Sequence, residues 1–185
     1  MDGKRPRRFR RPAGLRGELL DWMESILISV AVVVLIFTFL LRPVGVDGDS
    51  MRPTLEDGDR LLVTHLFYTP RRGDIVVVNS TGLGKLIVKR VIGLPGDTVD
   101  IDFERHEVYV NGEEQNEPYI DEPTQDPEDV AFPVTVSENA LFVMGDNRNN
   151  SQDSRSAAVG QIDEEDIIGK AVFRLYPFSS VGFIS

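Results

Sequence analysis

Ser50 and Lys89 are candidates for a pair of residues that carries out nucleophilic catalysis. Ser50 lies in the stretch VDGDSMRPTLEDGD, where Gly48 and the neighbouring aspartates favour a turn that exposes the hydroxyl. A serine hydroxyl is a weak nucleophile and needs a general base close by. The chain contains no cysteine, which excludes a thiol nucleophile, disulfides and cysteine-ligated zinc.

Neither histidine of the chain is favoured as the base of a serine triad. His65 lies in a strand-like apolar stretch and His106 at an expected hairpin tip, so both are interpreted as structural. Neither belongs to an HExxH motif or has a second ligand at helical spacing, which argues against zinc. Asp97, Asp100 and Asp102 lack the glycine and the final glutamate of a calcium loop. We therefore expect no metal and no cofactor.

Lys89 is the alternative base. In LIVKRVIG, a strand would place Ile87, Lys89 and Val91 on one face. Burial among apolar side chains would lower the pKa of the lysine amine, and a neutral amine can take a serine proton. The local pattern equally allows Lys89 to reach solvent or to pair with an acid. A serine in a turn of this composition is more often a plain turn residue, so the local patterns leave the chemistry open.

An apolar segment precedes this pair in the chain. Residues 25–41, SILISVAVVVLIFTFLL, carry no charge, and the run reaches about 25 Å as a helix, near the lower limit for crossing a bilayer. We expect a transmembrane helix over 19–42, with Trp22 among the lipid headgroups. The basic residues before it make 1–18 a cytoplasmic arm and place 43–185 outside the cytoplasm. The predicted localisation is a cell membrane crossed once.

Two other interpretations of this segment are less favoured. A cleaved secretory signal has a shorter apolar run that ends in small residues, whereas Arg42 and Pro43 follow this one. A buried core helix would not be apolar on all faces with charges at both ends. Ser50 follows Leu41 by nine residues, at most about 30 Å of extended chain, so it must lie near the bilayer surface. A nucleophile there suits a substrate that is tethered in the membrane.

Beyond the apolar segment, short β-branched and aromatic runs alternate with glycine and proline. They predict a mainly β, antiparallel body, a barrel or sandwich, over 43–185. The expected strands are RLLVTHLFY, DIVVVNS, LIVKRVIG, two strands flanking 103–106, ALFVMGD and GKAVFRLYPF, with a turn at Asn111-Gly112 and a single helical turn in DEEDIIG. Residues 113–138 are acidic and rich in proline, and we expect a long excursion whose role the sequence leaves open.

The charge distribution narrows the range of partners. The formal net charge is −10, yet arginine and lysine exceed aspartate and glutamate in residues 1–42, so the rest of the chain is strongly acidic. Nucleic-acid binding needs a basic face that neutralises phosphates. The composition therefore argues against a nucleic-acid partner for the body, while a basic arm beside an apolar segment favours anionic lipid.

Four short motifs in order carry a family resemblance. They are GDSMRPTL at Gly48–Leu55, RGDIVVV at Arg72–Val78, KRVIGLPGD at Lys89–Asp97 and GDNRNNSQDSR at Gly145–Arg155. These motifs follow an apolar segment, and they resemble the successive conserved motifs of the bacterial type I signal peptidases. The resemblance is to the branch of that family with a single membrane anchor. The resemblance extends from the apolar segment to GKAVFRLYPF and leaves out the basic arm and the excursion.

The resemblance implies a role for each matching residue. Ser50 would be the nucleophile that forms an acyl intermediate, and Lys89 its general base. Ser151 would hydrogen-bond to the lysine amine and orient it. The remaining matches would form two supporting ion pairs, Asp146 with Arg90 and Asp153 with Arg155.

Two positions depart from the family pattern. The Ser50 amide would be one oxyanion donor. Many relatives carry a second donor hydroxyl two residues before the nucleophile, where this chain has Gly48, so the second donor is undefined. Asn149 stands where other members have aspartate.

The implied substrates are exported preproteins with N-terminal signal peptides. The peptide would lie extended against an edge strand, with alternate side chains in shallow apolar pockets that admit only small residues, as in Ala-X-Ala. The expected pocket wall consists of Met51, Leu55, Ile87 and Val88.

Two alternatives share some of these features. A self-cleaving regulator can use the same Ser/Lys pair, but the apolar segment and the lack of a DNA-binding domain speak against it. A catalytically inactive envelope binding module would have lost Ser50, Lys89 or Ser151, and all three are present.

Overall fold

The computed structural model describes residues 15–66 and 68–184, which fall into two compact units divided after Phe39. The described part of the first unit is helix α1, Leu15–Phe39. Its serines satisfy their hydroxyls within the helix, Ser25 on the Asp21 carbonyl and Ser29 on the Ser25 carbonyl. This back-bonding is how a helix accommodates hydroxyls on an apolar surface.

The bounds of α1 differ from those expected at both ends. Residues 15–18, expected in the basic arm, are helical, and the arm before them lies outside the described residues. The expected helix ran to residue 42, but Leu41 already begins strand β1. Pro43 lacks the amide hydrogen that a continuing helix needs, and it is tolerated in β1 because this strand is at the sheet edge.

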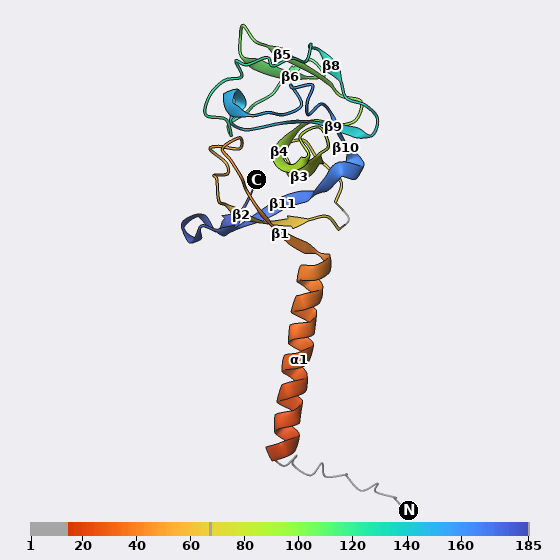
Figure 1. Ribbon diagram of the computed structural model, residues 1–185, viewed down its shortest axis with the longest axis vertical. Helices are drawn as coiled ribbons and strands as arrows, with labels where there is room; N and C mark the ends of the chain where they lie inside the picture. The colour runs from red at the N-terminus through yellow and green to blue at the C-terminus, as the bar shows by residue number, and fades with distance from the viewer. Residues whose placement is uncertain (1–14, 67, 185) are drawn as a thin grey trace, which may run out of the picture. The chain divides into compact units, whose positions relative to one another are not determined.

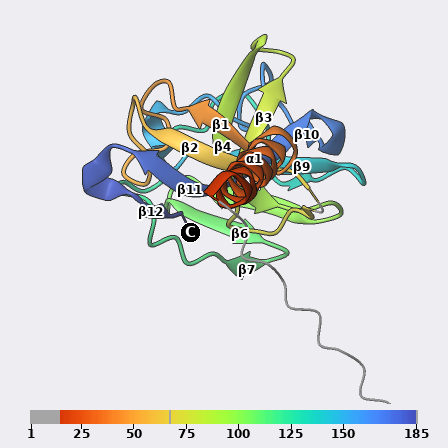
Figure 2. The ribbon, with the colours of Figure 1, turned by 90° about the horizontal axis from the view of Figure 1, so that it is seen from below.

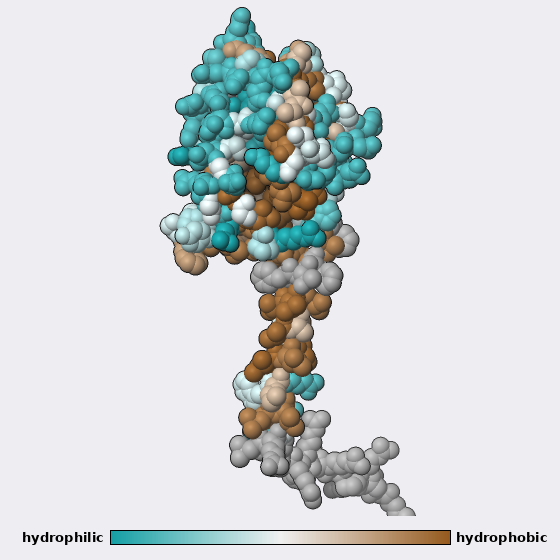
Figure 3. Space-filling view, viewed as in Figure 1, coloured by the Kyte–Doolittle hydropathy of each residue, from teal (hydrophilic) through white to brown (hydrophobic). Residues whose placement is uncertain are grey.

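The expected transmembrane helix is not confirmed. Within residues 15–66 and 68–184, no helix combines the length and the apolarity required to cross a bilayer. The apolar side chains described between Leu19 and Leu35 are nonetheless largely exposed, as the brown surface of α1 in Figure 3 shows.

The mainly β, antiparallel body is confirmed. Its larger sheet has the strand order β1-β2-β11-β3-β4-β9-β10, and β12 pairs with β11 (Figure 1; Figure 2). The strands of this sheet are β1 Leu41–Gly45, β2 Arg60–Thr64, β3 Ile75–Ser80, β4 Lys85–Gly93, β9 Ala140–Met144, β10 Ile162–Asp163, β11 Ile167–Tyr176 and β12 Gly182–Phe183.

A smaller sheet is inserted between β4 and β9. Its order is β7-β6-β5-β8, with β5 Thr98–Asp102, β6 Glu107–Val110, β7 Glu113–Glu114 and β8 Val134–Thr135. The predicted turn joins β6 to β7, where Asn111 and Gly112 both have positive φ, as a two-residue hairpin requires. Because β4 and β9 are hydrogen-bonded neighbours, this insertion leaves the larger sheet continuous.

Three short 3-10 helices complete the part of the body that the structure describes. They are η1 Arg148–Asn150, η2 Glu164–Asp166 and η3 Phe178–Ser180. The helical turn predicted in DEEDIIG is η2. The strand predicted over 60–68 ends at Thr64.

The central strand β3 explains why the sequence holds an unbroken valine run. Ile75 and Val77 belong to one core cluster, and Val76 and Val78 to another on the opposite face. A strand covered on both faces needs apolar residues at every position. A third cluster fills the space beside the smaller sheet, around Phe142.

Candidate active site

The turn that carries Ser50 is closed by its own backbone. The Val46 amide donates to the Asp59 carbonyl at 2.8 Å, and the Gly58 amide donates to Val46 at 3.0 Å. At Gly48 the backbone φ is +90°, which a residue with a Cβ adopts only with strain. These constraints leave the Ser50 side chain partly exposed at the end of a cleft.

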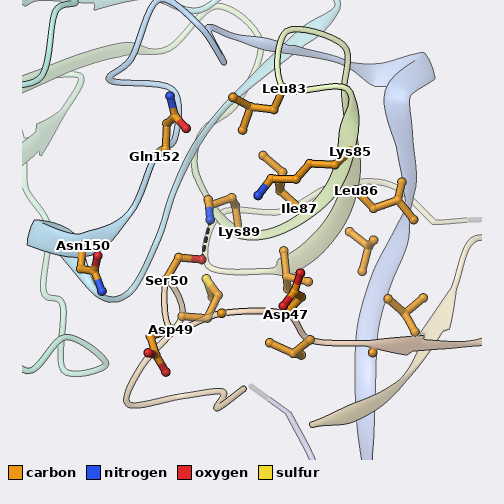
Figure 4. A pocket seen from close by; sticks show the side chains of 17 residues that line it. Asp47, Asp49, Ser50, Leu83, Lys85, Leu86, Ile87, Lys89, Asn150 and Gln152 are labelled. Carbon is orange, nitrogen blue, oxygen red and sulfur yellow. Dashed lines mark hydrogen bonds between the residues drawn. The ribbon is translucent and has the colours of Figure 1, made fainter. Parts of the chain in front are cut away.

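Lys89 projects from β4 onto this serine. Its Nζ lies 2.7 Å from Ser50 Oγ, as the dashed line in Figure 4 marks. The lysine is only 3% exposed, and this burial lowers the pKa of its amine to about 8. The Asp153 carboxylate opposes the shift, whereas Lys85 and Arg155 add to it. At neutral pH, roughly a tenth of the amine is uncharged and able to accept a proton.

The loop after β9 is tied directly to the Ser50 turn. The Asn147 amide donates to the Ser50 carbonyl at 3.1 Å, and Asn147 Nδ2 donates to the Asp49 carbonyl at 3.0 Å. A Cβ at Gly145 would clash with the Ser50 carbonyl and the Ser151 hydroxyl. Glycine at 145 is therefore required for the two segments to approach.

Both expected ion pairs are present and buried. Arg90 donates from Nε and Nη2 to the two oxygens of Asp146, at 2.8 and 2.7 Å. Arg155 donates in the same bidentate way to Asp153, at 2.9 Å on each oxygen. Two parallel bonds fix the guanidinium plane as well as its distance from the carboxylate. The pairs therefore set the position of the charges around Lys89.

A family comparison identifies the chain. The family described as signal peptidase, peptidase S26, matches residues 19–176. The chain belongs to this family. It is 40% identical to signal peptidase I of Bacillus licheniformis over 179 residues, which cover 90% of this chain and 93% of that one. It is 35% identical to signal peptidase IB of Staphylococcus aureus strain Mu50 over 187 residues, which cover 89% and 93%.

A solved signal peptidase I from Enterococcus faecalis V583 is 30% identical. It matches 56% of this chain and 97% of that one, with a TM-score of 0.46.

The Ser151 side chain of this signal peptidase differs from the expectation. Its hydroxyl donates to Asp153 Oδ2 at 2.7 Å, and within the described residues no hydrogen bond joins it to Lys89. A hydroxyl binds a buried carboxylate more strongly than it binds an amine. Ser151 therefore contacts the carboxylate whose charge raises the pKa of Lys89.

A cleft of about 250 Å³ extends from Ser50 along β1 and the first half of β4. Three of the four predicted wall residues line it: Met51, Ile87 and Val88. The fourth, Leu55, does not, so its assignment to the wall was wrong. The Leu55 amide donates to the Met51 carbonyl, and this turn directs the Leu55 side chain into the core, where it is fully buried.

Other residues of the cleft were missed from the sequence. They include Val44, Leu83, Lys85, Leu86, Asn150 and Gln152. The signal for Val44 was Pro43, which ends the helix and begins an extended edge strand. The signal for Lys85 was its spacing of four from Lys89, which places both side chains on one face of a strand. In Figure 4 the Lys85 side chain extends over the cleft toward Lys89.

The Ser50 amide is available as an oxyanion donor. Within the described residues it donates to no backbone or side-chain acceptor. Gly48 stands where many relatives carry a second donor hydroxyl. Its amide donates to Asp57 Oδ1 at 2.8 Å. That bond holds the turn and leaves the second donor undefined.

Proposed function

We propose that this enzyme removes N-terminal signal peptides from exported preproteins by a Ser50/Lys89 mechanism. The observation that carries the proposal is the 2.7 Å contact between the Ser50 hydroxyl and a buried lysine amine. The relatives named signal peptidase I support the substrate class.

Acylation begins with the uncharged form of Lys89. In that form the Ser50 hydroxyl donates to Nζ, and the amine takes the proton as Oγ attacks the carbonyl carbon of the scissile bond. The negative charge that develops on the carbonyl oxygen is stabilised by the Ser50 amide. The tetrahedral intermediate then breaks its C–N bond, and Lys89 gives its proton to the departing amine of the mature protein.

Deacylation repeats these steps with water. Lys89, again uncharged, takes a proton from a water molecule whose oxygen attacks the ester carbonyl. The ester bond breaks, the signal peptide leaves with a free carboxylate, and the proton returns to Ser50 Oγ. In each half of the reaction Lys89 first accepts a proton and then donates it. A pKa close to the working pH suits both the acceptance and the donation.

The cleft favours an extended peptide. Strand β4 pairs with β3 over its whole length up to Arg90, but within the described residues β9 covers its other edge only from Arg90 onward. Lys85–Lys89 thus keep free backbone groups that a substrate strand can pair with. Met51 and Ile87 are almost fully buried and limit the depth of the cleft, which favours small side chains such as alanine before the cut.

We further infer that α1 attaches the enzyme to a membrane. Leu19, Trp22 and Leu27 are all more than half exposed, and a contiguous apolar surface of this kind usually marks a contact with lipid or protein. The topology proposed from the charge distribution is a single pass with a cytoplasmic N-terminus and an extracytoplasmic body.

The catalytic proposal is tested by cleavage of a preprotein with an Ala-X-Ala site, using the full chain in detergent. Wild type should cut after the second alanine, and Ser50→Ala and Lys89→Ala should be inert at every pH. Ser137→Ala, at an exposed serine far along the chain, is the matched control and should cut normally. Near-normal cleavage by Lys89→Ala would show that another residue is the general base. Absence of cleavage by folded wild type would reject the proposed function.

Membrane attachment has a separate test. Alkaline carbonate should leave the full chain in the membrane pellet, and protease added outside intact spheroplasts should digest the body. Release into the supernatant would refute attachment, and protection of the body would refute the proposed orientation.

A further inference from the structure

The segment 117–130, here called the strap, lies within the acidic excursion that the family resemblance does not include. It contacts the loop after β9 through three of that loop's side chains. One of these is Arg148, whose side chain has no exposed surface. Arg148 donates to the Gly145 carbonyl within its own loop, and across to both oxygens of Glu117 at 2.7 and 2.6 Å and to Thr124 Oγ1 at 2.9 Å.

Tyr119 of the strap contacts the residue next to the proposed base. Its ring centroid lies 4.0 Å from Cζ of Arg90 and 5.9 Å from Cζ of Arg148. An arginine over an aromatic face is attracted to the ring and shielded from water by it. The Tyr119 hydroxyl donates to Glu117 at 3.1 Å, so the ring is held from its far end.

Asn149 fastens the middle of the strap and explains a departure from the family pattern. Its Oδ1 accepts from the Gln125 amide at 2.9 Å, while its Nδ2 donates to the Pro123 carbonyl at 3.1 Å and to Glu122 at 3.2 Å. An ionised aspartate has no donor for the Pro123 carbonyl and would repel Glu122. Asparagine at 149 therefore suits a chain that has this strap.

Arg155 joins the end of the strap to the second ion pair. It donates to the Asp126 carbonyl at 2.9 Å, and its own carbonyl accepts from the Val130 amide at 3.0 Å. The same guanidinium binds Asp153, the carboxylate that raises the pKa of Lys89 most. The strap thus touches both arginines of the two ion pairs.

The charged groups that act on Lys89 come from three segments. They are Lys85 from β4, Asp146 from the loop between β9 and η1, and Asp153 and Arg155 from the loop after η1. Two of the four are carboxylates whose arginine partners contact the strap. A displacement of those arginines changes both the charges near the amine and the access of water to it.

We propose that the strap is a positioning element of the active site, in which Tyr119 acts through Arg90 to hold Lys89 against Ser50. The inference rests on the proposed Ser/Lys mechanism. Arg90 follows Lys89 directly on β4, so the ring fixes the backbone of the base through the adjacent residue. A shift of a catalytic group by about 1 Å can cost on the order of a hundredfold in rate.

The test compares Tyr119→Leu with Tyr119→Phe in the full chain, in detergent, with preprotein cleavage measured across pH. Tyr119→Leu removes the aromatic face, and we expect kcat to fall roughly tenfold with KM unchanged. Water that reaches the Arg90 pair also hydrates Lys89, so the acid limb of the rate should move to higher pH. Tyr119→Phe loses the hydroxyl bond to Glu117 but keeps the aromatic face over Arg90, so its kcat should fall less than that of Tyr119→Leu and its pH profile should stay close to that of wild type.

Tyr109→Leu is the matched control, because Tyr109 lies on β6, donates to Glu107 and pairs with Arg105, none of which the proposal places in the site. If Tyr119→Leu does not fold, Asn149→Ala decides, with Asn139→Ala at an exposed position as its control. Asn149→Ala should lower kcat, as Tyr119→Leu does, and Asn139→Ala should not. Folded Tyr119→Leu or Asn149→Ala with wild-type kcat and pH profile would overturn the proposal. Wild-type cleavage in the same assay shows independently that the proposed function holds.

Discussion

Replacing Lys89 by methionine should abolish activity and yet stabilise the protein at neutral pH. Methionine has nearly the length of lysine and no charge, so it fits a site that is 3% exposed. In the wild type, burial lowers the pKa of the amine from 10.5 to about 8, which means that the charged form is disfavoured in the folded state.

The size of this effect follows from the pKa shift. Each unit is worth about 1.4 kcal/mol, so keeping Lys89 charged in the folded protein costs about 3 kcal/mol. The variant also loses the contact between Lys89 and Ser50, worth about 1 kcal/mol. The net expected gain is about 2 kcal/mol near pH 7. For a chain of this size it corresponds to about 6 °C in Tm.

The gain should disappear as the pH rises. Between pH 8 and 10.5 the unfolded chain holds a proton on Lys89 that the folded chain has released, so wild-type stability increases over this window. Below pH 8 both states are protonated, and the full cost remains. Lys89→Met has no such group, and the two stability curves should converge above pH 8.

The assay is thermal unfolding of wild type, Lys89→Met and Ser50→Ala in detergent from pH 6 to pH 10. Ser50→Ala is inactive but keeps the buried lysine, so it should follow the wild-type pH dependence. A Tm difference between wild type and Lys89→Met that stays constant with pH would refute the assignment of a depressed lysine pKa.

Three further outcomes are expected. Lys85→Gln removes a positive charge that lowers the Lys89 pKa, so the acid limb of the cleavage rate should move to higher pH, as a pH profile of kcat/KM would show. Asp146→Asn leaves the Arg90 charge buried without its partner and should lower the free energy of unfolding by about 3 to 5 kcal/mol, measured by urea denaturation. Leu55→Ala creates a core cavity and should cost about 2 to 5 kcal/mol while the cleaved position in the substrate stays the same; a changed cleavage position would return Leu55 to the cleft.

The sequence indicated the residues of the site better than their contacts. Ser50 and Lys89 stand in motifs whose order along the chain indicated the family. The β-branched residues predicted the valine-rich strand, and the Asn-Gly pair predicted the turn at Asn111-Gly112. The partner of Ser151 did not follow, because the choice between an amine and a carboxylate depends on where Asp153 lies in space.

Leu55 shows a second limit of local patterns. An apolar residue five positions after a nucleophile can face a cleft or the core, and the backbone bond from its amide to Met51 decides between them. The strap shows a third limit. Glu117 and Tyr119 lie in an irregular acidic segment, and nothing near them in the sequence indicates that Arg148 and Arg90 are their partners.

The position of β11 also determines when the enzyme can first work during its synthesis. This strand lies between β2 and β3, with Lys170 paired to Thr64 on one side and to Val76 on the other. Until the ribosome has made residues 167–176, β2 and β3 each have an open edge and the sheet that carries Lys89 is divided. Pairing between such distant segments is slow to form. A nascent chain would therefore carry Ser50 and Lys89 for most of its synthesis before the two could be held together, and a chain cut short before β11 would remain without a joined sheet.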